Sequence, residues 1–145
     1  MAGFTVTAFG LAPLMPDAAQ LPVRTLSQVV QPDGLTPQSD ALAALPGHAR
    51  VCCTHEYTLS NLRFARAVEP GNQALLHYSS HCESLRARQL PTLPSRMALE
   101  RAINPFLRTR VPTVAAAAAG FAPSTDTRDA VAVLAALREW KNGFR

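Results

Sequence analysis

The sequence has 145 residues, of which 48% are hydrophobic and 17% are charged, so it is long enough to bury one core. Its net charge of +4 is small, no basic run marks a nucleic-acid groove, and no stretch reaches the ~20 uninterrupted apolar residues that span a bilayer. Alanine dominates the apolar residues and only 6% are aromatic, which favours helices. Three cysteines are too few for a disulfide framework and fit a reducing compartment. We therefore expect a cytoplasmic, monomeric, mainly α protein with no nucleic-acid or membrane partner.

Residues 1–38 differ from the rest of the chain, because prolines recur through them without helical or strand periodicity. A segment of this kind buries too little apolar surface to order itself, so we expect it to be poorly ordered. Its prolines are Pro13, Pro16, Pro22, Pro32 and Pro37.

Residues 39–57 predict a short helical turn followed by one strand. The letters DALAAL (40–45) suit the turn, which a Pro-Gly pair closes, and RVCCT (50–54) suits a buried strand. The two cysteines of this strand are interpreted as core residues, because no cation other than Arg50 adjoins them to activate a thiol. The strand runs into a polar cluster, and α/β folds bind ligands at the carboxyl ends of strands.

Residues 58–145 predict consecutive helices, separated by proline and glycine and carrying apolar residues at helical spacing. Thr58 or Ser60 is placed to cap the first helix, Ser95 the third and Asp126 the last. The predicted helices are 59–68, 72–88, 96–103, the stretch from Pro112 to Gly120, and a last helix that starts at Asp126 and ends between Trp140 and Asn142.

The polar cluster contains His55, which stands at the exit of the predicted strand, where an imidazole is placed to ligate a metal. The alternative is a histidine with a purely structural role. His77 and His81 share one helix face, as a zinc pair requires. No acidic or cysteine ligand supports them at a suitable spacing, so this pair is interpreted as part of a solvated helix face.

Arg138 and Lys141 are three residues apart on the last predicted helix and therefore emerge on one side of it. Such a pair can clamp a carboxylate or phosphate, with arginine offering two parallel hydrogen bonds. The alternative is that the two charges only complement the helix dipole. Arg63 and Arg66 are expected to be solvated, with Glu69 spaced to pair with Arg66.

Three blocks of sequence, in the same order, resemble hydroxyacylglutathione hydrolases (glyoxalase II) of the metallo-β-lactamase superfamily. The resemblance covers roughly residues 40 to 145, and its first block is the most specific. The blocks are VCCTHEYTLSNLRFARAVEPGN (51–72), PTLPSRMALERAINPFLR (91–108) and LREWKNGF (137–144).

The resemblance implies a helical glutathione-recognition domain (58–145), preceded by a remnant strand (39–57) of a metallo-β-lactamase-like αββα domain. It implies hydrolysis of S-(2-hydroxyacyl)glutathione thioesters to glutathione and a 2-hydroxy acid such as D-lactate, a step of methylglyoxal detoxification. By the matching motifs, His55 would ligate the second metal of a binuclear site, usually zinc and sometimes with iron or manganese. Tyr57 would contact glutathione, and the pair Arg138 and Lys141 would bind one of its carboxylates.

The sequence also departs from the pattern of this family. The T-H-x-H-x-D-H motif, the later histidine of a G-H-T block and the bridging aspartate of a G-D-T-L-F block are absent, so of the usual metal ligands only His55 can be assigned. A zinc ion needs about three protein ligands even when one position stays open. We therefore expect a truncated chain with little or no hydrolase activity alone. The alternative is a non-catalytic helical module that binds a protein partner or a small anion.

Overall fold

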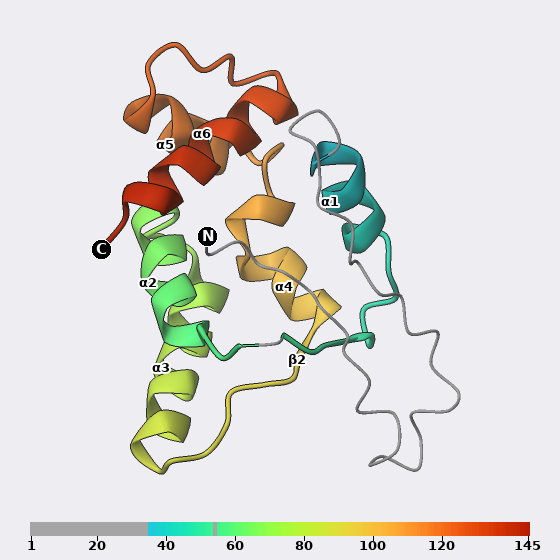
Figure 1. Ribbon diagram of the computed structural model, residues 1–145, viewed down its shortest axis with the longest axis vertical. Helices are drawn as coiled ribbons and strands as arrows, with labels where there is room; N and C mark the ends of the chain where they lie inside the picture. Colours follow the sequence, from blue (N-terminus) through green and yellow to red (C-terminus); the bar gives the residue numbers. More distant parts are fainter. Residues whose placement is uncertain (1–34, 54) are drawn as a thin grey trace.

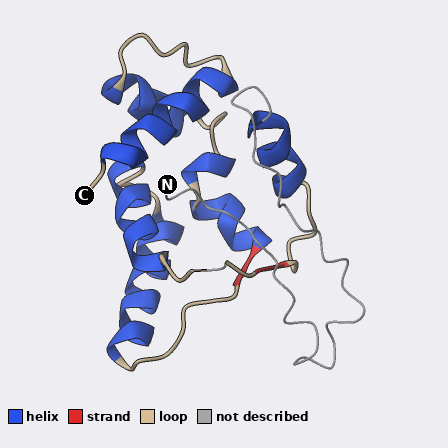
Figure 2. Ribbon diagram, viewed as in Figure 1, coloured by secondary structure: helices blue, strands red, loops and turns tan. Residues whose placement is uncertain are grey.

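The computed structural model describes residues 35–53 and 55–145, so the expectation of poor order for residues 1–38 falls largely outside the described part. That part is mainly helical with one small sheet, which confirms the predicted fold class (Figure 2). No described helix has the length and apolarity to cross a bilayer. The elements in chain order are α1 (Leu35–Ala43), β1 (Arg50–Val51), α2 (Thr58–Val68), α3 (Gln73–Ala87), β2 (Ser95–Arg96), α4 (Met97–Ile103), η4 (Pro105–Leu107), α5 (Pro112–Phe121) and α6 (Ala130–Gly143).

The helix α2 is the centre of the fold, because its two sides belong to two different core clusters. Phe64 and Val68 pack with buried residues of η4, α5 and α6, whereas Leu62 and Ala65 pack with buried residues of α3 and α4. In Figure 1, α4 lies between α1 and the α2–α3 pair, and α5 and α6 pack together across one end. A side chain on α2 is therefore held from two directions by close-packed neighbours.

The sheet consists of β1 and β2, which pair antiparallel with Val51 opposite Ser95. The strand ends at Val51, its one buried residue, so the predicted strand over 50–54 is too long. The prediction that both cysteines are core residues is wrong for Cys52, which is exposed, and Cys53 is half-buried. Since β2 is the only strand that pairs with β1 in the described part, no further strand covers the positions after Val51.

The segment after α1 is tied to α4 by Arg101. Its Nη1 atom donates hydrogen bonds to the carbonyl oxygens of Ala43 at 2.8 Å and Leu45 at 2.7 Å. Gly47 lies against the same helix, where an added Cβ atom would come 3.2 Å from the Cβ of Ala98. The absence of a side chain at Gly47 therefore permits this close approach of the two backbones.

The starts of α2 and α4 differ from the predicted caps. The residue before α2 is Tyr57, which makes no side-chain cap, so the prediction of a cap at Thr58 or Ser60 is wrong. The residue before α4 is Arg96, not Ser95. The reason is that Ser95 belongs to β2, and its hydroxyl donates instead to the Glu100 carboxylate at 2.5 Å.

The starts of α3 and α6 carry genuine side-chain caps. Asn72 accepts a hydrogen bond from the backbone N–H of Leu75 at 3.1 Å, and Asp129 accepts one from Val131 at 2.9 Å. Asp126, the predicted cap of the last helix, instead bonds within the preceding turn, three residues too early.

Candidate functional site

His55 and Tyr57 lie together in the short link between β1 and α2. Their rings stack, with centroids 5.4 Å apart and planes 14° from parallel. Tyr57 precedes the first turn of α2, and its carbonyl accepts from the N–H of Asn61 at 2.9 Å. Both rings reach solvent, since His55 is exposed and Tyr57 is 53% exposed. The link therefore exposes a stacked pair of rings at the surface.

A small cavity adjoins this ring pair, with a volume of about 40 Å³. A cavity needs about 10–15 Å³ of such volume to hold one water molecule, so this cavity has room for a few waters and not for a peptide-sized ligand. Glu100 on its wall is 8% exposed and accepts from the side chains of Ser95 and Asn104. The cavity wall therefore carries a buried carboxylate whose hydrogen-bond partners belong to the protein itself.

Cys53 also lines this cavity, and its chemistry is that of a protonated thiol. Burial raises the pKa of the Cys53 thiol, and the negative charge of Glu100 raises it further. The thiolate, not the thiol, is the nucleophile in cysteine chemistry. Cys53 is therefore not set up for nucleophilic attack at neutral pH.

Lys141, in the last turn of α6, is the only lysine of the sequence and is almost fully buried. It is 7% exposed, and its Nζ atom lies 5.3 Å from the centre of the Phe64 ring. Burial lowers the pKa of Lys141, and the positive charge of Arg63 lowers it further. The ring of Phe64 offers partial compensation as a cation–π partner. Arg138, one turn earlier on α6, is half-buried.

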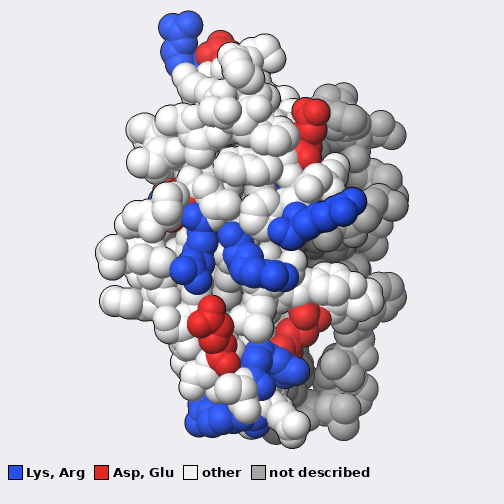
Figure 3. Space-filling model, turned by 90° about the vertical axis from the view of Figure 1, so that its left-hand side faces the viewer, with Lys and Arg blue, Asp and Glu red and all other residues white. Residues whose placement is uncertain are grey.

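The helix α2 joins the two parts of the candidate site. Tyr57 immediately precedes this helix, and Phe64, whose ring lies beside the ammonium of Lys141, comes seven positions later. Seven positions are two helical turns and about 10 Å along the axis. Figure 3 shows the side of the molecule that lies on the left in Figure 1, and Lys and Arg side chains gather across the middle of this face. The roles predicted for Tyr57, Arg138 and Lys141 stay predictions, but the fold relates them through one helix.

The described residues do not fit a metal centre. Among them, no group of three or more His, Cys, Asp or Glu side chains could hold a metal ion. His55 is thus a single potential ligand, whereas zinc requires about three from the protein. His77 and His81 are exposed on α3.

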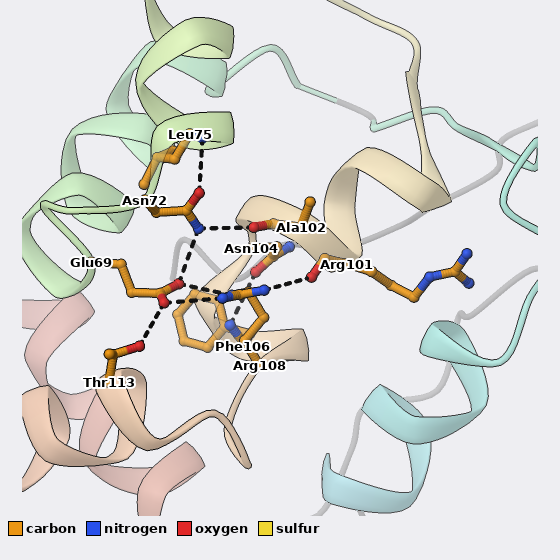
Figure 4. A network of polar contacts seen from close by, with 9 residues as sticks. All are labelled: Glu69, Asn72, Leu75, Arg101, Ala102, Asn104, Phe106, Arg108 and Thr113. Carbon is orange, nitrogen blue, oxygen red and sulfur yellow. Dashed lines mark hydrogen bonds and ion pairs between the residues drawn. The ribbon is translucent and has the colours of Figure 1, made fainter.

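A polar network around Glu69 connects the end of α2 with the start of α3 and the start of α5 (Figure 4). Arg108 donates two bonds to the Glu69 carboxylate, from Nε at 2.8 Å and from Nη2 at 3.0 Å. The Thr113 hydroxyl donates to the same carboxylate at 2.8 Å. The network therefore links the end of α2 to the segments before and at the start of α5. The predicted pairing of Glu69 with Arg66 is wrong. The Nη1 atom of Arg66 instead lies 3.8 Å from the Oε1 atom of Glu83.

Sequence reasoning missed the Glu69 network because its partners are 39 and 44 residues away along the chain. Burial acts to raise the pKa of Glu69. The hydrogen bonds from Arg108, Thr113 and Asn72, together with the charge of Arg108, outweigh it and hold the pKa below its usual range. No local spacing in the sequence indicates this arrangement.

The fold and the site define a helical domain in which an exposed aromatic pair precedes α2 and two cations, Arg138 and Lys141, lie on α6, with Lys141 buried against Phe64 of α2. The family model described as hydroxyacylglutathione hydrolase C-terminus matches residues 56–144. The chain therefore belongs to this family, which confirms the resemblance drawn from the sequence motifs.

Curated relatives agree with this assignment over the same region. The chain is 62% identical over 105 residues to the hydroxyacylglutathione hydrolase of Albidiferax ferrireducens, covering 72% of this chain and 40% of the relative. It is 55% identical over 108 residues to the protein of the same name from Cupriavidus taiwanensis, covering 73% and 39%. The protein of that name from Nitrosomonas europaea is 48% identical over 104 residues, covering 72% and 39%. The chain thus spans about two fifths of the length of the curated relatives it matches.

Proposed function

We propose that this chain is the substrate-recognition part of a hydroxyacylglutathione hydrolase. In this proposal it binds the glutathione moiety of S-(2-hydroxyacyl)glutathione thioesters, with Tyr57 beside the peptide and Arg138 and Lys141 on one of its carboxylates. The observation that carries the proposal is the burial of Lys141, which is 7% exposed and has no acidic partner among the described residues.

Lys141 carries its positive charge in a buried position. Taking an ammonium group out of water without a counter-charge is unfavourable, so buried lysines are normally paired. The Phe64 ring supplies part of the missing interaction, and a carboxylate ligand would supply the opposite charge that the described residues do not. In this proposal Arg138, three residues earlier on the same helix, adds two parallel hydrogen bonds to the same carboxylate.

The hydrolytic step itself is not assigned to the described residues. Cys53 is held as a thiol, and His55 is a single potential metal ligand in that part of the chain. We propose His55 as the contribution of this part to a two-metal centre, with zinc the expected metal and iron or manganese the alternatives. We further propose a cytoplasmic location, because the three cysteines are free, as suits a reducing compartment.

The experiment is a calorimetric titration of glutathione into the full chain and into Arg138→Ala. We expect the variant to bind about tenfold more weakly, since it loses a charge-assisted hydrogen-bonded pair. The matched control is Arg128→Ala, whose side chain is 92% exposed in the loop before α6 and should bind like the wild type. Absence of glutathione binding in every form would favour a binding module for another partner. A thioester assay with metal analysis completes the test, and turnover with two bound metals would contradict the proposed division of roles.

A further inference from the structure

Thr92, in the link between α3 and β2, bonds to the two residues that flank Tyr57 in the sequence. Its backbone N–H donates to the Oε2 atom of Glu56 at 3.3 Å, and its hydroxyl donates to the hydroxyl of Thr58 at 2.7 Å. Thr92 is 5% exposed, so water competes little for its side of these bonds. One buried residue therefore holds the chain immediately before and immediately after Tyr57.

Thr92 is itself held in place by α3. The Tyr78 hydroxyl donates to the carbonyl oxygen of Thr92 at 3.4 Å, so the N–H, the carbonyl and the hydroxyl of Thr92 all have a partner. In the last turn of α3, Arg86 donates to the carbonyl oxygen of Leu90 at 2.9 Å, and its Nε atom lies 3.4 Å from the Oε1 atom of Glu56. Contacts from two positions on α3 therefore fix the link that carries Thr92.

The rings of His55 and Tyr57 depend on this frame, because the core does not hold them. Both side chains are exposed, and neither belongs to a core cluster of the described part. Their stacking fixes the two rings relative to each other, but it does not fix the direction in which the pair points. That direction is set by the backbone on either side of Tyr57, which Thr92 holds. Binding groups supported in this way by buried hydrogen bonds are oriented before a ligand arrives.

We infer that Thr92 is a positioning residue of the glutathione site, where it holds His55 and Tyr57 in the orientation that meets the ligand. The inference rests on the proposed function, in which Tyr57 lies beside the peptide of glutathione. The apparent affinity for a ligand falls with the fraction of the protein that has the binding conformation. Loss of the Thr92 hydroxyl lowers this fraction and removes no group that touches the ligand.

The test is a calorimetric titration of the full chain with S-methylglutathione, which lacks the thioester and cannot be hydrolysed. Thr92→Val removes the hydroxyl but keeps the backbone N–H and the branched shape. We expect it to bind about fivefold more weakly, the equivalent of one net hydrogen bond. Thr92→Ser keeps a hydroxyl and should bind within about twofold of the wild type.

The matched control is Ser79→Ala on α3. Ser79 is 3% exposed, and its hydroxyl donates to the carbonyl oxygen of Leu75 at 2.8 Å. The substitution therefore also removes a hydrogen bond made by a buried hydroxyl, but one that does not reach the residues beside Tyr57. It should bind within about twofold of the wild type.

An NMR spectrum reports on the ring pair directly. The ring current of Tyr57 shifts the proton signals of the His55 imidazole, which is one of four histidines and is assigned by its loss in His55→Asn. Thr92→Val should move these signals toward their positions in Tyr57→Leu, whereas Thr92→Ser and Ser79→Ala should leave them in place. A change in stability alone does not move them, because the folded ring pair is then unaltered. Should Thr92→Val fail to fold, Thr58→Val removes the same hydrogen bond from its other partner and should give the same shift.

The outcomes separate this inference from the function on which it rests. If wild type binds S-methylglutathione, the inference is wrong when Thr92→Val binds it equally well or leaves the His55 signals in place, and the proposed function then stands. Equal losses of binding for Thr92→Val and Ser79→Ala would also overturn it, because a general loss of stability would then explain both. If wild type does not bind S-methylglutathione, the proposed function fails and takes the inference with it.

Discussion

The Nζ atom of Lys141 lies 5.3 Å from the centre of the Phe64 ring, which joins the last turn of α6 to the middle of α2. Phe64 is fully buried and also contacts Trp140 and Phe144, with ring centroids 5.6 Å and 5.4 Å away. The cation of the candidate site is therefore seated on the packed core rather than on a loop. Groups held in this way are already oriented before a ligand arrives.

Replacing Lys141 with methionine should separate stability from binding. Burial lowers the pKa of Lys141, which means that the fold disfavours its charged form. Lys141→Met keeps the length of the side chain and removes the charge, so its free energy of unfolding at pH 7 should equal or exceed that of wild type by up to about 1 kcal/mol. Glutathione binding should be lost. Urea denaturation and calorimetry check both parts, and a loss of stability above about 1 kcal/mol would show that the ammonium is well compensated.

The ring of Phe64 should contribute more to the free energy of unfolding than the ring of Phe121, which belongs to the same cluster of aromatic rings. Phe64→Leu leaves a partly filled space in the core, and we expect it to lower the free energy of unfolding by about 1–2 kcal/mol. It should also weaken glutathione binding, because Lys141 loses its ring partner. The matched control is Phe121→Leu, at a site 42% exposed, with an expected change below about 0.5 kcal/mol. Equal effects of the two substitutions in urea denaturation would contradict this ranking.

The Glu69–Arg108 pair predicts a specific loss of stability in acid. The pKa of Glu69 is held below its ordinary value of 4.5, so the folded state binds its proton less readily than the unfolded state. Its stabilisation is therefore complete above pH 4.5 and is lost as the pH falls through the lower, folded pKa. Glu69→Gln should be less stable than wild type by about 3 kcal/mol at pH 7, and this difference should shrink in acid.

The control for Glu69 is Glu83→Gln, which removes an exposed ion pair of 3.8 Å and should change stability by less than about 0.5 kcal/mol at any pH. Denaturation curves of the three proteins across pH provide the comparison. A difference between wild type and Glu69→Gln that is the same at pH 7 and in acid would contradict the role given to the Glu69 charge.

The three cysteines should react with iodoacetamide in an order set by exposure and pKa. Cys52 is exposed, whereas burial raises the pKa values of Cys53 and Cys82. Since the thiolate is the reactive form, Cys52 should be alkylated first. Mass spectrometry of the labelled peptides checks the order. Faster labelling of Cys53 would reopen a role for it as a nucleophile.

The parts of the structure that the sequence predicted are those with local signals. Asn72 and Pro112 mark helix starts that the structure places within one residue, because a cap and a proline act on their own neighbours. The side-by-side placement of Arg138 and Lys141 on one helix also followed from spacing alone. What could not be predicted depends on contacts between distant segments.

Ser95 illustrates the limit of such local reasoning. Its residue type and position suit a helix cap, but pairing with Val51 places it in a strand, and its hydroxyl goes to Glu100. In the same way, the burial of Lys141 depends on the position of Phe64, which lies 77 positions earlier in the chain. The roles of the candidate site residues stay predictions, whereas the ring beside the lysine required the structure.

The most direct test of glutathione recognition at Lys141 uses its status as the only lysine of the sequence. A chain labelled with ¹³C-lysine gives one lysine signal in an NMR spectrum, and its shift against pH reports the pKa of Lys141 without any modification. We predict a pKa below the ordinary 10.5 in the free chain, which moves upward when S-methylglutathione is added because a carboxylate favours the charged form. A pKa at the ordinary value, unchanged by the ligand, would contradict the claim that this buried cation binds a carboxylate of glutathione.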